Sequence, residues 1–139
     1  MTVRVWLPAT VAELGRWWAD REVPARAGHA VTAALRASWP EGSEEEWEYA
    51  VLLAAAGDAA AMLASPGRRV VVVADADDGA VEEAEGSAVR LATPVPWRRL
   101  AAVHADPPGT LVGPADQDAP ELCWYAVQEV PDVVAAPEA

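Results

Sequence analysis

The sequence contains no lysine, asparagine, isoleucine or phenylalanine in 139 residues, and all ten of its basic residues are arginine. The four absent residue types share AT-rich codons, so their absence indicates a gene from a GC-rich genome rather than a chemical specialisation. Its physical consequence is a hydrophobic core of valine, leucine, alanine and tryptophan. The seven tryptophans must fill the volume that phenylalanine and isoleucine would otherwise fill.

Cysteine occurs once, at Cys123, which excludes an internal disulfide and a metal cluster held by cysteines. This residue lies in the apolar run LCWYAV, where we expect a buried and unreactive thiol. The N-terminal stretch MTVRVWLPA lacks the apolar region of a signal peptide, and no segment approaches the length of a membrane span. We therefore expect a cytoplasmic protein that does not bind membranes.

The common catalytic and nucleotide-binding motifs are also missing. The chain has no P-loop, no GxGxxG, no HExxH and no GxSxG. The usual signatures of nucleotide enzymes, zinc proteases and serine hydrolases therefore do not apply. We expect no cofactor and no resident metal.

Acidic residues outnumber basic ones by 22 to 10, which gives a formal net charge of −12. A hydrophobic content of 53% nevertheless predicts a folded chain rather than a disordered one. Most of the acidic excess lies after residue 40, where nineteen acids stand against five arginines. Because phosphate binding depends on cationic side chains, this surface disfavours nucleic acid. It serves solubility alone, attracts a specific basic partner or mimics nucleic acid.

The stretch Ser43–Ser65 predicts a long central helix. Ser43 and Glu46 form a capping-box pattern at its start, and Pro66-Gly67 supplies a stop. Its second half is apolar on nearly every side, with Asp58 as the one charge, so we expect a buried helix with neighbours on more than one side. We expect an arginine or several hydrogen-bond donors against Asp58, unless that side of the helix is open to solvent.

Four consecutive valines, Val70 to Val73, predict a central strand that is covered on both faces. Val3–Leu7 predicts a first strand ended by Pro8. Thr10 and Glu13 form a second capping-box pattern, which predicts the start of a short helix over residues 11–21, the best candidate for part of a second layer. Residues 23–40 remain open between strand and helix. Further strands are expected at residues 88–93, 100–105 and 122–127.

Together these elements predict one α+β domain over residues 1–130, with α/β layers. We expect a mixed sheet of four or five strands, one long central helix and one or two shorter helices. Residues 131–139 are expected to form a flexible C-terminal tail.

The chain also carries, in this order, the blocks VRVWLPAT, HAVTAALR, EEEWEYAVLLAAA, RRVVVVADA, AVRLATPVPWRRLAAVHAD and ELCWYAVQEVPDVV. Through these blocks nearly the whole chain resembles a family of short actinobacterial proteins of uncharacterised function. The resemblance implies an intracellular, single-domain protein. It implies no activity and no catalytic residue.

Acidic residues follow two of the predicted strands. Asp75 ends the valine-rich strand, and His104 and Asp106 end another, on one face because residues two apart in a strand point the same way. Carboxylates and an imidazole at strand ends are a common ligand position in α/β sheets and would suit Mg²⁺ or Mn²⁺. The alternative is ordinary turn chemistry, since Asp before Gly or Pro often ends a strand.

Arginine pairs precede two predicted strands, at Arg68-Arg69 and at Arg98-Arg99. If those strands are neighbours, the two pairs could gather into an anion-binding site. The alternative is that they pair with the surplus acids and flank apolar strands to prevent aggregation.

The tryptophans are numerous for so small a domain. Tryptophan is often partly exposed and is enriched at protein interfaces. We expect one or two of them to lie at an interface, and the candidates are Trp17, Trp18, Trp97 and Trp124.

Two functions follow from these patterns. The first is a non-catalytic, acidic interaction module that binds another protein or a second copy of itself. The alternative is a small metal-assisted hydrolase or a phosphate-ligand enzyme that uses Asp75, His104, Asp106 and the arginine pairs. The position of these side chains relative to a cleft discriminates between the two.

Overall fold

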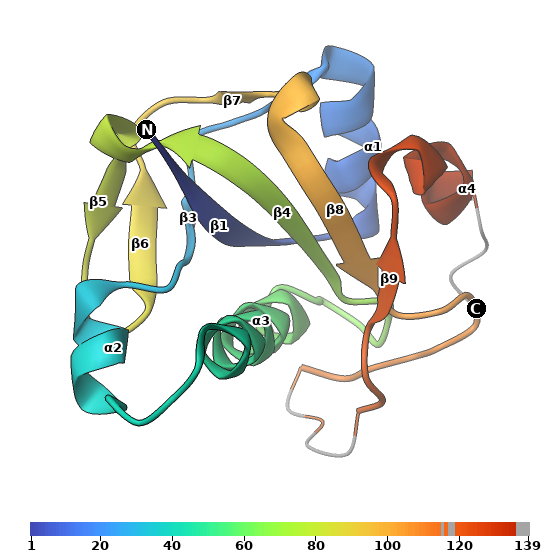
Figure 1. The fold of residues 1–139 in the computed structure, drawn as a ribbon. Coiled ribbons are helices and arrows are strands. Elements are labelled where there is room, and N and C mark those ends of the chain that lie inside the picture. Colours follow the sequence, from blue (N-terminus) through green and yellow to red (C-terminus); the bar gives the residue numbers. More distant parts are fainter. Residues whose placement is uncertain (115, 117–118, 136–139) are drawn as a thin grey trace.

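The structure is a computed structural model that describes residues 1–114, 116 and 119–135. The described residues form a seven-stranded sheet in the order β5-β6-β3-β1-β4-β8-β9, and every neighbouring pair is antiparallel (Figure 1). The strands of this sheet are β1 (Thr2–Ala9), β3 (Ala27–His29), β4 (Val70–Asp77), β5 (Val81–Glu83), β6 (Ala88–Leu91), β8 (Leu100–Ala105) and β9 (Cys123–Tyr125). A separate ladder joins β2 (Glu22–Val23) to β7 (Val95–Pro96).

The α+β class is confirmed, but the expected mixed sheet of four or five strands is wrong in both size and strand direction. β3 and β5 have three residues each, too few for the period-2 alternation that marks a strand in a sequence. Whether neighbouring strands run parallel or antiparallel depends on how distant segments of the chain are connected, which a local sequence pattern does not show. Pro8, expected to end the first strand, instead lies within β1 opposite Val71.

β4 is the central strand, as the four valines predict. Its whole length pairs with β1 on one side, and most of it pairs with β8 on the other. Val70 and Val72 belong to the core cluster on one face of the sheet, whereas Val71 and Val73 belong to the cluster on the opposite face. Both faces of β4 are therefore covered, which is why a run of valines is stable there.

Helix α3 (Glu44–Ala61) covers one face. Ser43 is its N-cap, with the predicted capping box to Glu46. The helix has 18 residues and ends before the expected Ser65. Val51, Ala55 and Ala56 pack against Trp6 and the odd-numbered valines of β4.

The expected burial of α3 on more than one side is wrong. Its outer side faces solvent, and the side chain of Leu53 is 53% exposed. Alanine occurs on nearly every side of α3, so the sequence does not show which side of the helix is buried.

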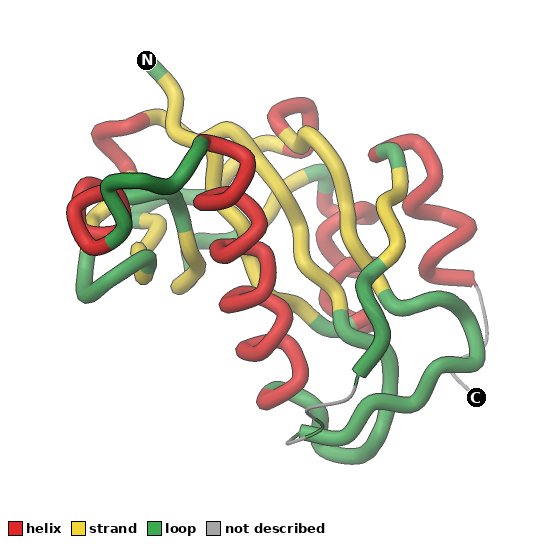
Figure 2. The backbone as a smooth tube through the Cα atoms, turned by 60° about the horizontal axis from the view of Figure 1, so that its bottom comes forward, coloured by secondary structure: helices red, strands yellow, loops and turns green. Residues whose placement is uncertain are grey.

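Helices α1 (Val11–Asp20) and α4 (Val130–Ala135) cover the opposite face, so α3 and this pair sandwich the sheet (Figure 2). The second layer predicted for residues 11–21 is thereby confirmed. Helix α4 corrects the predicted tail, because Val130 and Val133 are buried in the core. Residues 131–135 are thus part of a packed helix, and residues 136–139 lie outside the described part of the chain.

Residues 23–40 contain both a strand and a helix, β3 and α2 (Ala33–Ser38), and Thr32 caps the latter. Within the described residues, α1, α2 and α4 make three shorter helices rather than the expected one or two. The same part of the chain contains three 3₁₀ turns: η1 (Asp78–Ala80), η2 (Trp97–Arg99) and η3 (Val127–Glu129).

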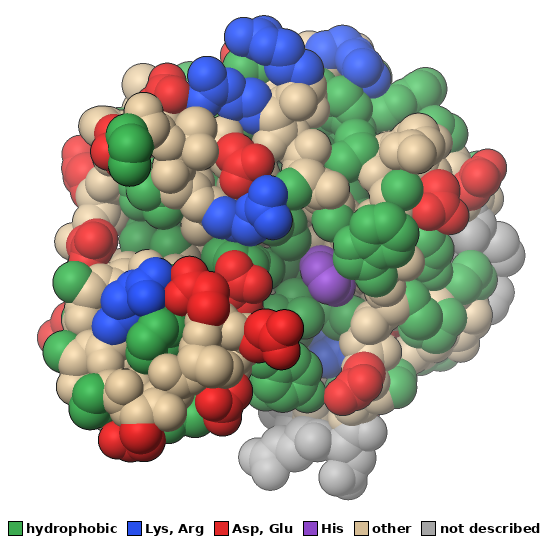
Figure 3. All heavy atoms as spheres, in the orientation of Figure 1, with side chains coloured by type: hydrophobic (Ala, Val, Ile, Leu, Met, Phe, Trp, Pro, Cys, Tyr) green, Lys and Arg blue, Asp and Glu red, His purple; other side chains and the backbone are tan. Residues whose placement is uncertain are grey.

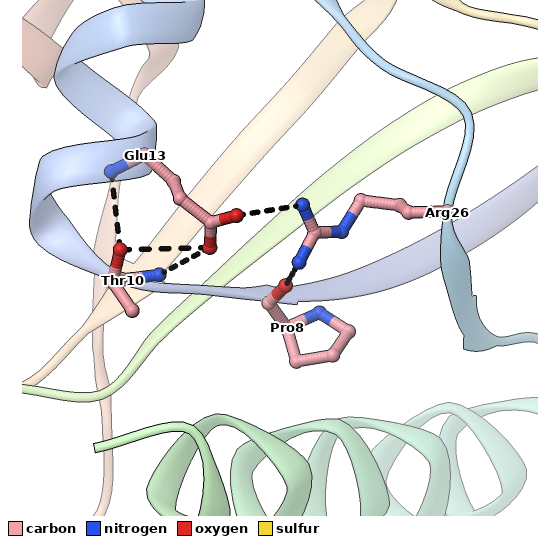
Figure 4. Close-up of polar contacts among 4 residues, drawn as sticks. All are labelled: Pro8, Thr10, Glu13 and Arg26. Atoms are coloured by element: carbon pink, nitrogen blue, oxygen red, sulfur yellow. Dashed lines mark hydrogen bonds and ion pairs between the residues drawn. The ribbon is translucent and has the colours of Figure 1, made fainter. Parts of the chain in front are cut away.

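Arg26 fastens α1 to the sheet (Figure 4). The backbone N–H of Glu13 donates to the Thr10 side chain at 3.1 Å, and the Thr10 N–H donates back to the Glu13 carboxylate at 3.1 Å. Arg26 donates to the other carboxylate oxygen of Glu13 at 3.1 Å and to the Pro8 carbonyl at 2.8 Å. One guanidinium thus joins the cap of α1 to the end of β1.

Candidate functional site: a groove between helix α3 and strands β8 and β9

A groove of about 360 Å³ lies between the N-terminal half of α3 and the strands β8 and β9. Trp6, Ala102 and His104 from the sheet form its floor. Glu45, Glu48 and Tyr49 from α3 line one side, and Trp124 from β9 lines the other. We call this the α3 groove. Figure 3 shows this face, where hydrophobic side chains and carboxylates surround a hollow that contains a histidine.

Strand register explains why these side chains meet. Val71 lies opposite His104, and His104 lies opposite Trp124, so the three form one row across the sheet. Residues directly opposite in neighbouring strands project from the same face. Val71 packs beneath α3, which puts His104 and Trp124 on the α3 side as well. Short local ladders therefore build the groove from residues far apart in sequence.

The imidazole ring of His104 is half-buried in the groove floor and forms no hydrogen bond with any residue that the structure describes. Burial lowers the pKa of His104 below its ordinary value of 6.5, because desolvation disfavours the charged ring. The imidazole is therefore neutral at pH 7, and one ring nitrogen is available as an acceptor.

Arg4, at the edge of the groove, is held by Asp75. Its Nε and Nη2 atoms donate to the two carboxylate oxygens at 3.0 and 3.2 Å. These hydrogen bonds raise the pKa of Arg4, with smaller contributions from the charges of Asp75 and Glu48. The predicted ligand Asp75 thus lies on the same face as His104, but its charge is already paired.

On the α3 side of the groove, neither Glu45 nor Glu48 forms an ion pair among the described residues. The Tyr49 hydroxyl donates to Glu121 at 3.1 Å, and this hydrogen bond raises the pKa of Tyr49. With Arg4 neutralised by Asp75, the remaining charges around the groove are negative.

Asp106 is not part of the groove. It is fully buried, and it accepts hydrogen bonds from the backbone N–H and Nε of Arg69 at 2.8 and 2.9 Å and from its Nη2 at 2.7 Å. Within residues 1–114, 116 and 119–135, no group of three His, Cys, Asp or Glu residues is close enough to hold a metal. The structure therefore separates Asp106 from Asp75 and His104.

The two arginine pairs also lie apart. β4 and β8 are antiparallel, so Arg69 before β4 and Arg98-Arg99 before β8 lie at opposite ends of the sheet. Arg68 is buried and donates to the carbonyls of Asp106 and Val133, both at 2.9 Å. Arg99 pairs with Asp77 at 2.7 Å. The four arginines are therefore not gathered into one anion site.

The four candidate tryptophans divide into two groups. Trp17 and Trp97 are buried in the core, with the guanidinium groups of Arg26 and Arg21 over their rings. Trp18 is 40% exposed on α1. Trp124 is 61% exposed beside the groove.

The chain belongs to a family of unknown function (DUF6912). The match covers residues 3–134, which span the sheet and nearly all of α4. No curated protein and no solved structure gives a significant match. Family membership thus confirms a domain of unknown function over almost the whole chain. None of the described helices is long and apolar enough to cross a membrane.

In this member of the family, one polar cluster has no signal in the sequence. The His29 ring lies 2.8 Å through Nδ1 from the Ser87 hydroxyl and 2.6 Å through Nε2 from the Asp58 carboxylate. These three residues are far apart in the sequence, so no local motif indicates the cluster. In a serine-hydrolase triad the aspartate contacts Nδ1 and the serine contacts Nε2, the reverse of this arrangement. The cluster joins β3, α3 and the turn before β6.

The structure also tests two expectations for single side chains. The side of α3 that carries Asp58 is open to solvent, the alternative left open above, since 58% of this side chain is exposed, and its partner is His29 rather than an arginine. Cys123 is exposed on β9 rather than buried, because β9 is the edge strand and is only three residues long.

Proposed function

We propose that this protein is a non-catalytic interaction module that binds a basic protein partner through the α3 groove. The observation that carries the proposal is the exposed apolar surface around that groove. Trp124 is 61% exposed, Tyr49 is 50% exposed and Leu53 is 53% exposed. Partly exposed aromatic side chains beside a pocket supply much of the binding energy at protein interfaces.

The apolar surface extends beyond the groove. A second pocket of about 210 Å³ lies between α3 and the segment 119–122, and it shares Tyr49 and Leu52 with the α3 groove. Leu53, Ala56 and Leu122 line it. Two adjoining pockets along one helix suit an extended or helical segment of a partner better than a small metabolite.

Charge favours a partner other than a second copy. The chain carries −12, so two copies repel each other, whereas a basic partner is attracted during diffusional encounter. Glu45, Glu48 and Glu121 provide negative charge at the two pockets.

The alternative, a hydrolase or phosphate-ligand enzyme, has less support. A catalytic base needs a group that orients it and a reacting group nearby. Asp75 is paired with Arg4, and Asp106 is paired with Arg69. His104 remains as a neutral imidazole with no carboxylate in hydrogen-bond contact among the described residues.

The test is affinity capture from a lysate of the source organism with three baits: the unchanged protein, Trp124→Ala and Trp18→Ala. Trp18 is the matched control, because it is an exposed tryptophan on the opposite layer. We expect a protein that the unchanged bait and Trp18→Ala retain and that Trp124→Ala loses by about tenfold or more, about 1.4 kcal/mol. Equal capture by all three folded baits would contradict the proposal.

A further inference from the structure

We infer that the α3 groove recognises an arginine side chain of the partner, with the guanidinium between Trp124 and the carboxylates of α3. This inference rests on the proposed function, because it names the group that anchors the partner. Three observations support it. Two carboxylates in the groove have no ion-pair partner, the His104 ring in the floor can accept a hydrogen bond, and other tryptophans of this chain carry an arginine guanidinium over their rings.

The unpaired charges favour a cation. The one cation in the groove, Arg4, has both carboxylate oxygens of Asp75 in contact. Glu45 and Glu48 have no ion-pair partner in the described chain. A cationic group that enters between α3 and β9 therefore meets two carboxylates that have no ion-pair partner, and Arg4, which already pairs with Asp75, offsets the charge of Glu48 only in part. The attraction between such a cation and these carboxylates is strongest where the partner excludes water.

The floor favours a cation that is rich in donors. The imidazole ring of His104 is half-buried, neutral at pH 7 and without a hydrogen-bond partner among the residues described. The unprotonated nitrogen of this ring can accept a hydrogen bond, and the ring itself carries no charge. A guanidinium has five N–H donors in one plane, so it can donate to a carboxylate and to the imidazole together. An ammonium group is a compact charge without this planar arrangement.

The chain itself supplies a precedent. In the described part, three tryptophan rings carry an arginine guanidinium: Trp17 under Arg26 at 4.6 Å, Trp47 under Arg36 at 4.7 Å and Trp97 under Arg21 at 5.4 Å. Such contacts are favourable because the ring face is electron-rich. Trp124 is the most exposed tryptophan, and among the side chains that the structure places it carries no guanidinium. Its ring is open to an arginine from outside.

The groove has room for an arginine side chain. Its volume of about 360 Å³ lies within the range of about 300–1,000 Å³ that is usual for pockets that hold a whole small ligand. The apolar stem of an arginine can lie along Trp6 and Leu52, which also line the groove. The rest of the partner would then extend over the second pocket beside Leu53.

The experiment uses N-acetyl-L-arginine amide as the probe and N-acetyl-L-citrulline amide as its uncharged match. The indole N–H signal of Trp124, assigned with Trp124→Phe, reports binding in an NMR titration. We expect a saturable shift with a millimolar dissociation constant for the arginine probe and binding about tenfold weaker or more for citrulline. No shift of the Trp124 signal at tens of millimolar, or equal binding of both probes, would overturn the inference.

Charge-removing variants test whether the carboxylates of α3 bind the arginine probe. Glu45→Gln with Glu48→Gln keeps the side-chain shape, and we expect it to weaken the arginine probe by about fivefold or more. Glu82→Gln with Glu83→Gln is the matched control, since these residues are exposed on β5 at the opposite edge of the sheet. Circular dichroism should show that both double variants are folded, and Glu45→Gln should lower the melting temperature only slightly, because it removes one negative charge from the first turn of α3. Equal weakening by both would mean that only net charge acts, which contradicts a specific site.

The capture experiment separates this inference from the proposed function. If the partner's retention depends on Trp124 but not on Glu45 and Glu48, the arginine anchor is wrong and the interaction module stands. If retention depends on none of the three, both proposals fail.

Discussion

At the scale of single residues, the chain uses charge pairs in two different ways. Arg69 and Asp106 form a buried pair in which Arg69 also donates to the Pro120 carbonyl. Arg99 and Asp77 form a pair of the same length, 2.7 Å, that is exposed at the other end of the sheet. Burial makes the difference, because an unpaired ion inside a protein cannot recover its hydration.

We therefore expect Asp106→Ala to lower the free energy of unfolding by about 3–5 kcal/mol, since it leaves the Arg69 guanidinium buried without its partner. Asp77→Ala should lower it by less than about 1 kcal/mol, because its pair is solvated. Urea denaturation of the two variants measures both values. Similar small losses in the two variants would mean that Asp106 is not a structural anchor.

His104 supports a prediction about pH. Burial lowers the pKa of His104 in the folded protein below 6.5, so the unfolded chain binds a proton here more readily than the folded chain does. The free energy of unfolding should then fall as the pH drops from about 6.5 towards the lowered pKa, and this penalty should be absent above about pH 7. Arg4 and the α3 residues Glu45, Glu48 and Tyr49 face the same groove.

The measurement is an NMR titration of the His104 ring together with melting temperatures of the unchanged protein and His104→Asn. We expect a ring midpoint below 6.5. We also expect that the variant loses less stability between pH 7 and pH 5 than the unchanged protein does. A midpoint at or above 6.5 would contradict the burial that we assign to this ring.

At the scale of elements, local chemistry predicts where elements start better than how they pair. The Ser43 and Thr10 capping boxes and the valine run are complete within a few residues, and all three appear as predicted. Strand direction and the short edge strands depend on contacts between distant segments, so no window of sequence contains them. The same reason explains why the sequence predicts only part of the candidate site. The sequence indicates His104 and Trp124 separately, but their adjacency comes from the β8–β9 register.

Helix α4 is the element that the sequence conceals most. Its six residues include a proline, and its last turn has no basic residue, so the sequence pattern is typical of a C-terminal tail. Its stability comes from packing instead. Val130 and Val133 are buried, and Val134 lies so close to α1 that a Cβ added at Gly15 would be 3.1 Å from its Cγ1.

We expect Val133→Ala to lower the free energy of unfolding by about 2 kcal/mol, because it removes two buried methyl groups and leaves a cavity in the core. Asp132→Asn, on the exposed side of the same helix, should change it by less than about 0.5 kcal/mol. Chemical denaturation of both variants gives the comparison. Equal stability of the two would show that α4 is only loosely attached.

At the scale of the whole molecule, the layers and the charge act together. The sheet is covered on one face by α1 and α4, while α3 leaves part of the other face open over β8 and β9. The exposed aromatic side chains Tyr49 and Trp124 lie at that opening. The molecule as a whole carries a net charge of −12. An apolar patch on a neutral protein would favour self-association, whereas the same patch on a strongly acidic one selects a partner of opposite charge.

This combination predicts a monomer that associates through a salt-sensitive encounter. Light scattering at micromolar concentration and low ionic strength should give the mass of one chain, 14.6 kDa, because two copies repel each other. Raising the salt concentration to about 0.5 M shortens the Debye length to less than about 5 Å, which should slow association with the basic partner and weaken its capture. Salt also screens repulsion between copies, so any dimer should appear there first and should disappear in Trp124→Ala. A stable dimer at low salt that survives Trp124→Ala would show that a different surface drives assembly, and it would remove the charge argument for a basic partner.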